Sequence, residues 1–378
     1  MRLRHPDGSL LHLAYCSNVH PADDLDGVVA QLERYSTRVR ERLDVPVLGI
    51  GLWLACAVAD DDATPGRLRS ELERLSLEVV TLNGFPYEAF HAAVVKRNVY
   101  RPTWADPRRR AYTLRLAWLL AELLPDDAAE GTISTVPLGW RDGWGPQANA
   151  AARAALELVA TELEHIEART GRRIRIALEP EPGCSIETTA QACAFLAGLA
   201  PERIGLCLDT CHLAVQFEQP DLALGLLADT GVPIVKAQVS NALRVSDPAS
   251  PEGRELLSRF DEPRFLHQVR ERVNGSVSGV DDLPEALAGG LPGENEWRVH
   301  FHVPVHTQEN TTQPEVVDTI RRLVGAATPG THHLEVETYT WSVLPDEPET
   351  DEELIDGLAA EVAWARDRLV EAGAEVVA

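Results

Sequence analysis

Acidic side chains follow two apolar segments in the middle of the sequence. Glu179 and Glu181 come directly after residues 174–178, and Asp209 ends the next apolar segment. Side chains two positions apart on a strand share a face. Glu179 and Glu181 are therefore expected to point together, away from the aliphatic side chains before them. Asp209 is expected to point the same way, with His212 in the loop just above it.

Polar side chains with the same spacing occur in the later apolar segments. They are Lys236, Gln238 and Ser240, then His300 and His302 with His306 beyond them, and finally Glu335 and Glu337. Acids at the ends of several parallel strands would converge on one axis, where carboxylates repel each other unless a proton or a cation intervenes. One divalent ion held by carboxylate oxygens and an imidazole would relieve this repulsion. Such a mixed ligand set suits Mn²⁺, Mg²⁺, Co²⁺, Fe²⁺ or Zn²⁺.

The elements that must position these residues alternate along the chain. The predicted strands are residues 11–15, 47–54, 78–82, 132–136, 174–178, 204–209, 234–239, 299–303 and 333–337. Amphipathic helical patterns lie between them, for example at 25–43, 65–75 and 148–170, which implies parallel strands with crossover helices. We predict an α/β fold in which residues 1–378 form a single (β/α)₈ TIM-barrel domain. Nine strands compete for eight places, so either 11–15 or 299–303 is expected to lie outside the barrel.

Two long segments follow predicted strands, at residues 84–110 and 241–296. Both are expected to be insertions on the C-terminal face of the barrel, where TIM-barrel active sites lie. Lys96 and Arg97 in the first insertion could bind a substrate phosphate, although an exposed helix face is the commoner role for such residues. A helical pattern at 354–372 should close the barrel wall.

The charge balance excludes some partners. The chain has 35 Lys and Arg residues against 59 Asp and Glu residues, a net charge of -24. Such a surface repels nucleic acid and anionic lipid heads. The N-terminal residues lack the apolar stretch of a signal peptide, and we find no apolar stretch long enough for direct membrane insertion, so a cytoplasmic location is expected. The six cysteines form no C-x-x-C pair and are expected to be reduced and structural.

Three segments resemble the xylose-isomerase-like superfamily of sugar (phosphate) isomerases and epimerases. They are LEPEPG at 178–183, LDTCH at 208–212 and LEVE at 334–337. The resemblance implies one metal ion bound by Glu179 and Asp209, and by a glutamate of the last strand. That glutamate is Glu337 or Glu335, of which Glu337 lies nearer the rim. It also implies a substrate contact for His212.

The sequence departs from that pattern on the seventh barrel strand. Gln238 stands where the superfamily usually has a metal-binding histidine. Either Gln238 binds the ion through its amide oxygen, or His302 fills the place from the following strand.

A narrower resemblance is to the EboE branch, a component of bacterial ebo gene clusters linked to metabolite traffic. The segments that carry it are YCSNVHP at 15–21, TLNGFPY at 81–87, VKAQVS at 235–240 and HLEVETYTW at 333–341. The likeness extends from about residue 11 to residue 341. It implies a small sugar-like metabolite as ligand, partner proteins from the same gene cluster, and transfer of a precursor towards the periplasm.

For an active site of this kind, the simplest reaction is proton transfer beside a carbonyl. A base removes the α-proton of an open-chain sugar, and the divalent ion stabilises the resulting enediolate. One of Glu179 and Glu337 would be the base and the other would return the proton. His212 would hold a hydroxyl group. Lys236 would neutralise the developing oxyanion, or equally serve as a buried ion-pair partner of Glu179 or Asp209.

Further residues are candidates for contact with the substrate. They are His20, Asn83, Glu181, His300, Glu335 and Trp341. His20 and Asn83 follow predicted strands, where pocket lining and loop capping are equally compatible with their side chains. Trp341, like Trp53 and Trp140, would suit the apolar face of a sugar, but core packing explains each tryptophan as well.

Other functions remain as alternatives. A non-catalytic metabolite-binding or transport protein that keeps the barrel is favoured by the replacement at Gln238. An endonuclease-like metal hydrolase would need a histidine-rich multi-metal site and a basic surface, and the acidic composition opposes it. Hydride transfer is not favoured, because no G-x-G-x-x-G motif follows a predicted strand.

Overall fold

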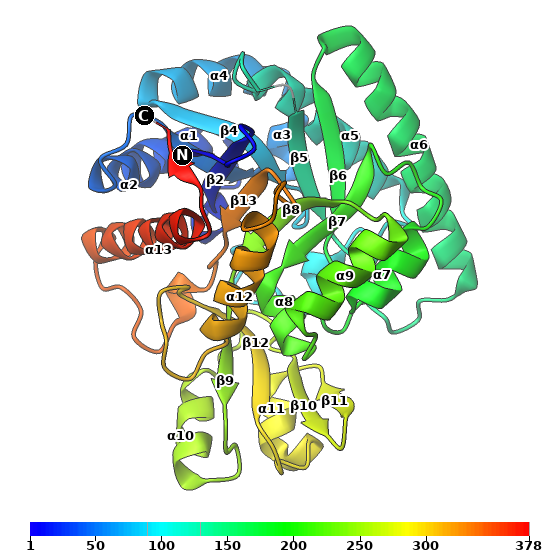
Figure 1. Cartoon of the computed structure of the whole chain (residues 1–378), viewed down its shortest axis with the longest axis vertical. Coiled ribbons are helices and arrows are strands. Elements are labelled where there is room, and N and C mark those ends of the chain that lie inside the picture. Colours follow the sequence, from blue (N-terminus) through cyan, green and yellow to red (C-terminus); the bar gives the residue numbers. More distant parts are fainter. Residues whose placement is uncertain (89, 129, 378) are drawn as a thin grey trace.

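A computed structural model describes residues 1–88, 90–128 and 130–377. Its centre is a closed barrel of eight parallel strands (Figure 1). In chain order these are β2 (Leu10–Cys16), β3 (Leu48–Trp53), β4 (Leu77–Asn83), β5 (Glu130–Thr135), β6 (Arg173–Leu178), β7 (Ile204–Asp209), β8 (Ile234–Val239) and β13 (His333–Val336). β13 pairs with both β8 and β2, and this closes the barrel. The predicted (β/α)₈ fold is confirmed.

The barrel helices surround these strands. They are α1 (Leu25–Gln31), α2 (Thr37–Arg42), α3 (Cys56–Ala59), α4 (Thr64–Leu75), α5 (Pro107–Leu123), α6 (Pro146–Thr170), α7 (Thr189–Leu196), α8 (Thr210–Val215), α9 (Pro220–Thr230), α12 (Gln313–Val324) and α13 (Asp351–Glu371). A π-helical turn, η2 (Leu32–Ser36), joins α1 to α2, so the three cover the predicted helix at 25–43. None of the helices in the described residues is long and apolar enough to cross a membrane.

Local sequence signals explain where the longest helices begin and end. α6 starts with proline at its first position and ends at Gly171, whose φ of 70° is the left-handed conformation that favours glycine. α13 begins with a capping box, in which Thr350 and Glu353 each bond the backbone N–H of the other. The buried faces of these helices pack against the apolar outer side of the barrel strands.

The ninth predicted strand belongs to a second, antiparallel sheet. Its order is β11 (Ser276–Val280), β10 (Val269–Val273), β12 (Trp297–Val303) and β9 (Asn241–Val245). With α10 (Pro251–Arg259), α11 (Leu283–Glu285) and η4 (Ala286–Gly290) it lies below the barrel in Figure 1. The predicted strand at 299–303 is therefore part of the insertion, and residues 11–15 belong to the barrel. The insertion predicted at 241–296 extends through β12.

The side-chain alternation of β12 turns one of its faces towards the barrel. Trp297, Val299, Phe301 and Val303 are all buried in the insertion's own apolar core. The residues between them, Arg298, His300 and His302, must therefore point the opposite way.

Smaller elements complete the chain. They are the short strands β1 (Arg2–Arg4) and β14 (Glu375–Val376), which pair with each other, and the 3₁₀ turns η1 (Ser17–Val19), η3 (Lys96–Tyr100) and η5 (Trp341–Val343). β1 also pairs with β2.

Candidate metal centre

A cavity with an empty volume of about 540 Å³ lies at the C-terminal ends of the barrel strands. Its polar lining is Asn18, Lys96, Glu179, Glu181, His212, His300, His302 and Glu337, and its aromatic lining is Phe85, Phe90, Tyr100, Phe265 and Tyr339. Both insertions contribute side chains, as expected for loops on this face of a TIM barrel.

Three carboxylates form a buried group beside the cavity. Glu179, Asp209 and Glu337 follow or end β6, β7 and β13, and each offers an oxygen within 4.8 Å of the other two. All three side chains are buried. The pKa of Glu179 is raised to about 7, because burial and the neighbouring Asp209 raise it by more than His212 lowers it. Burial and the charges of Glu179 and Asp209 raise the pKa of Glu337 well above its usual value. The group therefore needs protons or a cation.

The hydrogen bonds of this carboxylate group leave two buried oxygens without a protein partner. Asp209 is the N-cap of α8, and its Oδ1 accepts from the backbone N–H of His212 at 2.9 Å and from Ser240 Oγ at 2.7 Å. Gln238 Nε2 donates to both oxygens of Glu179 at 3.1 Å. Asp209 Oδ2 and Gln238 Oε1 have no partner in the described residues. Orphaned oxygens beside three carboxylates fit a divalent cation, because oxygen donors are what such ions prefer.

Three histidines lie beside this group, and each uses Nδ1 to contact a carbonyl oxygen. His212 Nδ1 lies 3.0 Å from the oxygen of Pro180, and His302 Nδ1 lies 2.8 Å from that of Glu337. His300 Nδ1 lies 2.7 Å from the amide oxygen of Gln268. Their Nε2 atoms meet: that of His300 lies 3.0 Å from that of His212 and 3.3 Å from that of His302.

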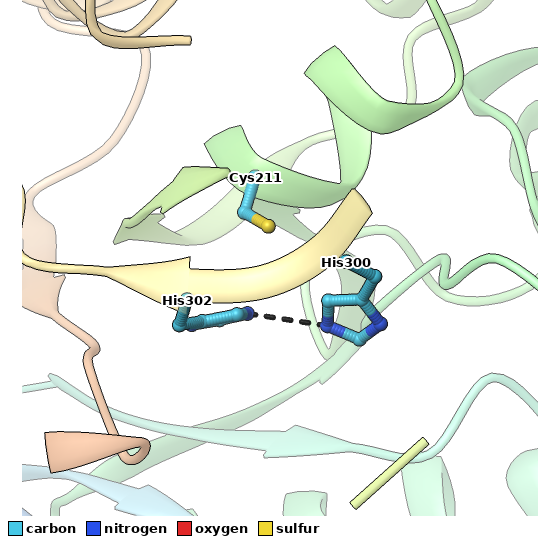
Figure 2. A group of neighbouring side chains, drawn as sticks. All are labelled: Cys211, His300 and His302. Atoms are coloured by element: carbon cyan, nitrogen blue, oxygen red, sulfur yellow. Dashed lines mark hydrogen bonds between the residues drawn. The ribbon is translucent and has the colours of Figure 1, made fainter. Parts of the chain in front are cut away.

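Figure 2 shows the second of these contacts. The rings of His300 and His302 extend from β12 towards each other, and Cys211 of α8 lies nearby. The sulfur of Cys211 lies within 4.8 Å of nitrogens of both rings. Burial raises the pKa of this thiol well above its usual value, so it stays protonated and is a poor ligand.

The three rings differ in their titration. Burial lowers the pKa of His302 to about 4 and that of His300 well below its usual value. Burial also opposes a charge on His212, but the carboxylates of Asp209, Glu181 and Glu179 outweigh it and raise the pKa of His212. His212 is thus the ring of the three that a proton prefers.

Lys236, Glu335 and Asn83 form a separate buried layer. Lys236 Nζ lies 2.7 Å from Glu335 Oε2, and both side chains are 0% exposed. Asn83 donates to Glu335 at 2.6 Å and accepts from Lys236 at 3.0 Å. Lys236 thus pairs with Glu335 rather than with Glu179 or Asp209. None of the three is among the residues that line the cavity.

Two other candidate residues also lie away from the cavity lining. His20 stacks on Tyr35 with ring centres 4.3 Å apart, and burial lowers its pKa to about 3. Trp341 donates to Glu361 at 2.9 Å. Its ring covers Gly357, where a Cβ would lie 2.4 Å from it.

The two basic residues of the first insertion have acidic partners. Lys96 pairs with Asp282 at 2.6 Å, and Arg97 pairs with Asp281 at 2.8 Å. These ion pairs hold η3 against the insertion that contains the second sheet. Neither the Lys96 nor the Arg97 side chain is therefore free to bind a substrate phosphate in this conformation.

The structure also brings in residues that sequence reasoning did not assign. Tyr100 donates to Glu181 Oε1 at 2.6 Å, and Gln268 donates to the Tyr100 hydroxyl at 3.1 Å. Asn18 donates to Glu337 Oε1 at 3.1 Å. Asn18 stands in the segment 15–21, so its place after a barrel strand was a usable signal. Gln268 precedes a strand that was not predicted, and no local pattern marks it.

Comparisons with known proteins agree with this architecture. The family described as "Xylose isomerase-like TIM barrel" matches residues 50–272, more than half of the chain. No curated protein matches the sequence. Among solved structures, D-allulose 3-epimerase from Methylomonas sp. in complex with D-allulose has a TM-score of 0.53 and 12% identity, covering 97% of this chain and 100% of its own.

Two further structures contain metal ions. A xylose isomerase-like TIM barrel protein from Mycobacterium smegmatis in complex with magnesium has a TM-score of 0.51 and 13% identity, covering 97% of this chain and 94% of its own. The IOLI protein with a bound zinc atom has a TM-score of 0.52 and 12% identity, covering 96% of this chain and 99% of its own. At these identities the likeness concerns the fold.

Proposed function

The chain belongs to the xylose isomerase-like TIM barrel family, and we propose that it is a divalent-metal-dependent isomerase or epimerase of a sugar or sugar phosphate. One observation carries the proposal: the buried carboxylates of Glu179, Asp209 and Glu337 meet beside the cavity, which Glu179 and Glu337 line, and the orphaned oxygens of Asp209 and Gln238 belong to the same group. Similar barrels with bound metal ions or a bound sugar support it.

Glu179, Asp209 and Glu337 would hold the ion, with Gln238 Oε1 as the neutral fourth ligand. We prefer Gln238 to His302 for this place. Gln238 is hydrogen-bonded to Glu179, which belongs to the carboxylate group. The ring of His302 instead offers a nitrogen within 4.8 Å of ligand atoms of Asp209 and His212. Mn²⁺, Mg²⁺, Co²⁺, Fe²⁺ and Zn²⁺ all accept such ligands. The ion would supply Lewis acidity, which stabilises negative charge on substrate oxygens.

The residues of the chain would carry the proton. One of Glu179 and Glu337 takes a proton from the carbon beside the substrate carbonyl. The other returns a proton to the neighbouring carbon while the hydroxyl proton passes to the former carbonyl oxygen, which isomerises the sugar. Return of the proton to the opposite face of the same carbon instead epimerises it. Burial raises the pKa of both carboxyl groups, which favours their holding the transferred proton.

The remaining lining would orient the substrate and exclude water. Glu181 and Tyr100 form a hydrogen-bonded pair beside the carboxylate group and can bond sugar hydroxyls. His212 and His300 would contact the substrate. Phe85, Phe90 and Tyr339 provide apolar surface for a sugar ring or chain.

We also propose the narrower setting that the sequence resemblance implies. The chain would act in an ebo-type metabolite traffic pathway, with proteins of the same gene cluster as partners. Residues 1–378 would act as one domain. The second sheet leaves the barrel after β8 and returns before α12, and its β12 supplies two histidines to the cavity.

One observation favours a second candidate, a non-catalytic metabolite-binding protein. Gln238 donates to both oxygens of Glu179. This contact satisfies the carboxylate that would otherwise remove the substrate proton. A binding protein would keep the cavity and the ion without turnover.

Metal analysis comes first, on the wild type and on Glu179→Gln and Asp209→Asn. Asp229→Asn on the exposed end of α9 serves as the matched control. A divalent ion present in the wild type and control but lost from both site variants supports the metal centre. Ketoses and aldoses are then incubated with the protein in D₂O. Deuterium uptake at the carbon beside the carbonyl, detected by NMR, supports the isomerase. Binding without uptake favours the second candidate, and absence of any metal refutes the metallo-isomerase.

A further inference from the structure

Gln268, in the insertion that contains the second sheet, holds its side-chain amide in one orientation. It directly precedes β10, and its side chain is 0% exposed. The amide nitrogen donates to the Pro182 oxygen at 2.8 Å and to the Tyr100 hydroxyl at 3.1 Å. That hydroxyl can accept this bond, because it donates its own proton to Glu181 at 2.6 Å. Turning the amide over would place its oxygen against the Pro182 oxygen, which also can only accept, so the nitrogen must lie on this side.

The amide oxygen of Gln268 therefore faces the ring of His300. It lies 2.7 Å from His300 Nδ1. An amide oxygen only accepts, so Nδ1 must carry a proton. Burial lowers the pKa of His300 well below its usual value, so the ring holds one proton rather than two. The other ring nitrogen, Nε2, then presents a lone pair, because the hydrogen bond made by one nitrogen decides which of the two is protonated.

The surroundings of His300 Nε2 require a donor at this point. His212 Nε2 lies 3.0 Å away and His302 Nε2 lies 3.3 Å away. The Nδ1 atoms of both of these rings also lie against carbonyl oxygens, so neither ring, when neutral, has a proton left for His300. The donor is then either a second proton on His212 or a hydroxyl group of a bound molecule. In both cases His300 is the acceptor, and it lines the cavity where such a molecule would lie.

We propose that Gln268 is a positioning residue for substrate binding. It fixes His300 in the tautomer with the proton on Nδ1, so that His300 Nε2 accepts a hydrogen bond from a hydroxyl group of the substrate. A polyhydroxylated molecule is the class of ligand that such an acceptor recognises. The identity of this ligand rests on the function proposed above, whereas the tautomer of His300 is a property of the protein alone.

The contacts of Gln268 join the barrel rim to both insertions. Pro182 follows β6, Tyr100 belongs to η3 in the first insertion, and His300 belongs to β12. The backbone N–H of His300 also donates to the Gln268 carbonyl oxygen at 2.8 Å. The lone pair that His300 presents is therefore set by the packing of both insertions against the barrel, rather than by β12 alone.

The first test needs no substrate. The whole chain, labelled with ¹⁵N at histidine and kept in Mg²⁺, is studied by long-range ¹H–¹⁵N correlation NMR, in which the shifts of the two ring nitrogens distinguish the tautomers. The signals of His300 are those missing from His300→Asn. We expect the proton on Nδ1 in the wild type. A wild-type ring with its proton on Nε2 would overturn the proposal, whether or not the protein is an isomerase.

Variants of Gln268 then test what fixes the tautomer. Gln268→Met removes the acceptor at similar length, so the tautomer with the proton on Nε2 should appear. Gln268→Glu keeps an acceptor oxygen and, when its carboxyl group is protonated, a donor to Pro182, so it should restore the wild-type spectrum. The exposed Gln147→Met is the matched control and should change nothing. An unchanged tautomer in Gln268→Met would show that Gln268 does not fix it. Circular dichroism verifies folding, and Gln268→Leu replaces Gln268→Met if the latter does not fold.

Kinetics separate positioning from a general loss of structure. For a ketose that shows deuterium uptake, Gln268→Met should raise KM roughly tenfold, about the worth of one hydrogen bond, and Gln268→Glu should recover most of it. His300→Asn should show the same loss, and combining it with Gln268→Met should add little. Additive losses would mean that the two residues act separately, which contradicts the proposal. If no sugar binds or takes up deuterium, the proposed function and the substrate contact fail together, while the NMR spectra still decide the role of Gln268.

Discussion

Lys236 Nζ and Glu335 Oε2 lie 2.7 Å apart in the barrel interior, and neither side chain is exposed. They come from neighbouring strands, β8 and β13, and Asn83 of β4 bonds both of them. Burial disfavours the charged lysine, but the charge and hydrogen bond of Glu335, together with other nearby groups such as Glu337, outweigh it and raise the pKa of Lys236. Lys236 neutralises Glu335, so Glu335 does not need a metal ion to balance its charge. Glu337, two residues later, belongs instead to the carboxylate group that does.

Lys236→Met should therefore destabilise the protein strongly. It leaves Glu335 charged and unpaired in the interior, which typically costs about 3–5 kcal/mol. Urea unfolding monitored by circular dichroism measures the change. The double variant Lys236→Met with Glu335→Gln should recover most of the loss, since it removes both charges. A loss of under roughly 1 kcal/mol in the single variant would show that the pair is not required.

Gly51→Ala should disturb the ion pair of Lys236 and Glu335 by displacing the Glu335 carboxylate. A Cβ at Gly51 would collide with the carboxylate of Glu335, so that carboxylate must shift from its position against Lys236 Nζ. We expect a loss of about 1–3 kcal/mol, as for other overpacked interiors. Gly225→Ala on α9 is the matched control, because a Cβ there meets nothing within 4 Å and alanine favours a helix. Equal unfolding midpoints for the two variants would argue against the close contact.

Gln238→Leu should weaken metal binding at the carboxylate site. It removes the orphaned Oε1 and the two hydrogen bonds to Glu179. We expect Mn²⁺ affinity, measured by calorimetry, to fall roughly 10–100-fold, the range seen when groups that support a metal site are lost. The exposed Gln147→Leu should bind as the wild type does. Unchanged affinity in Gln238→Leu would exclude the amide as a ligand.

Glu361 should make stability depend on pH. Its pKa is raised to about 7, because burial raises it by more than the hydrogen bonds from Thr338, the Val305 N–H and Trp341 lower it. The folded state therefore binds this proton more tightly than the unfolded state, whose glutamates titrate near about 4.3. The stabilising contribution is complete below that pH and is lost as pH rises towards 7.

The measurement compares the wild type with Glu361→Gln in urea at pH 5 and pH 8. Between these two values the wild type should lose about 2–3 kcal/mol relative to the variant, because one pKa unit corresponds to about 1.4 kcal/mol. If the stability difference between the two proteins is the same at both pH values, Glu361 has an ordinary pKa in the folded state.

Much of the barrel could be predicted from the sequence because its signals are local. Apolar runs of strand length alternate with helical patterns, and eight of the nine predicted strands are barrel strands. Strand alternation also predicts the inward direction of Glu179 and Asp209. His212 was expected in a loop after the strand, but it lies in the first turn of α8, whose N-cap is Asp209. These features depend on neighbours within a few residues, so the order of residue types determines them.

Only the tertiary structure decided which polar residues meet. Nothing near Lys236 in sequence shows that Glu335 is its partner, and nothing near His300 shows that Gln268 orients it. β12 reads as one more barrel strand, yet its apolar face packs on α10 and β9 rather than on barrel helices. Its polar face therefore carries His300 and His302 over the barrel mouth. Such contacts join residues tens to hundreds of positions apart, and they follow from packing in three dimensions, which local patterns do not record.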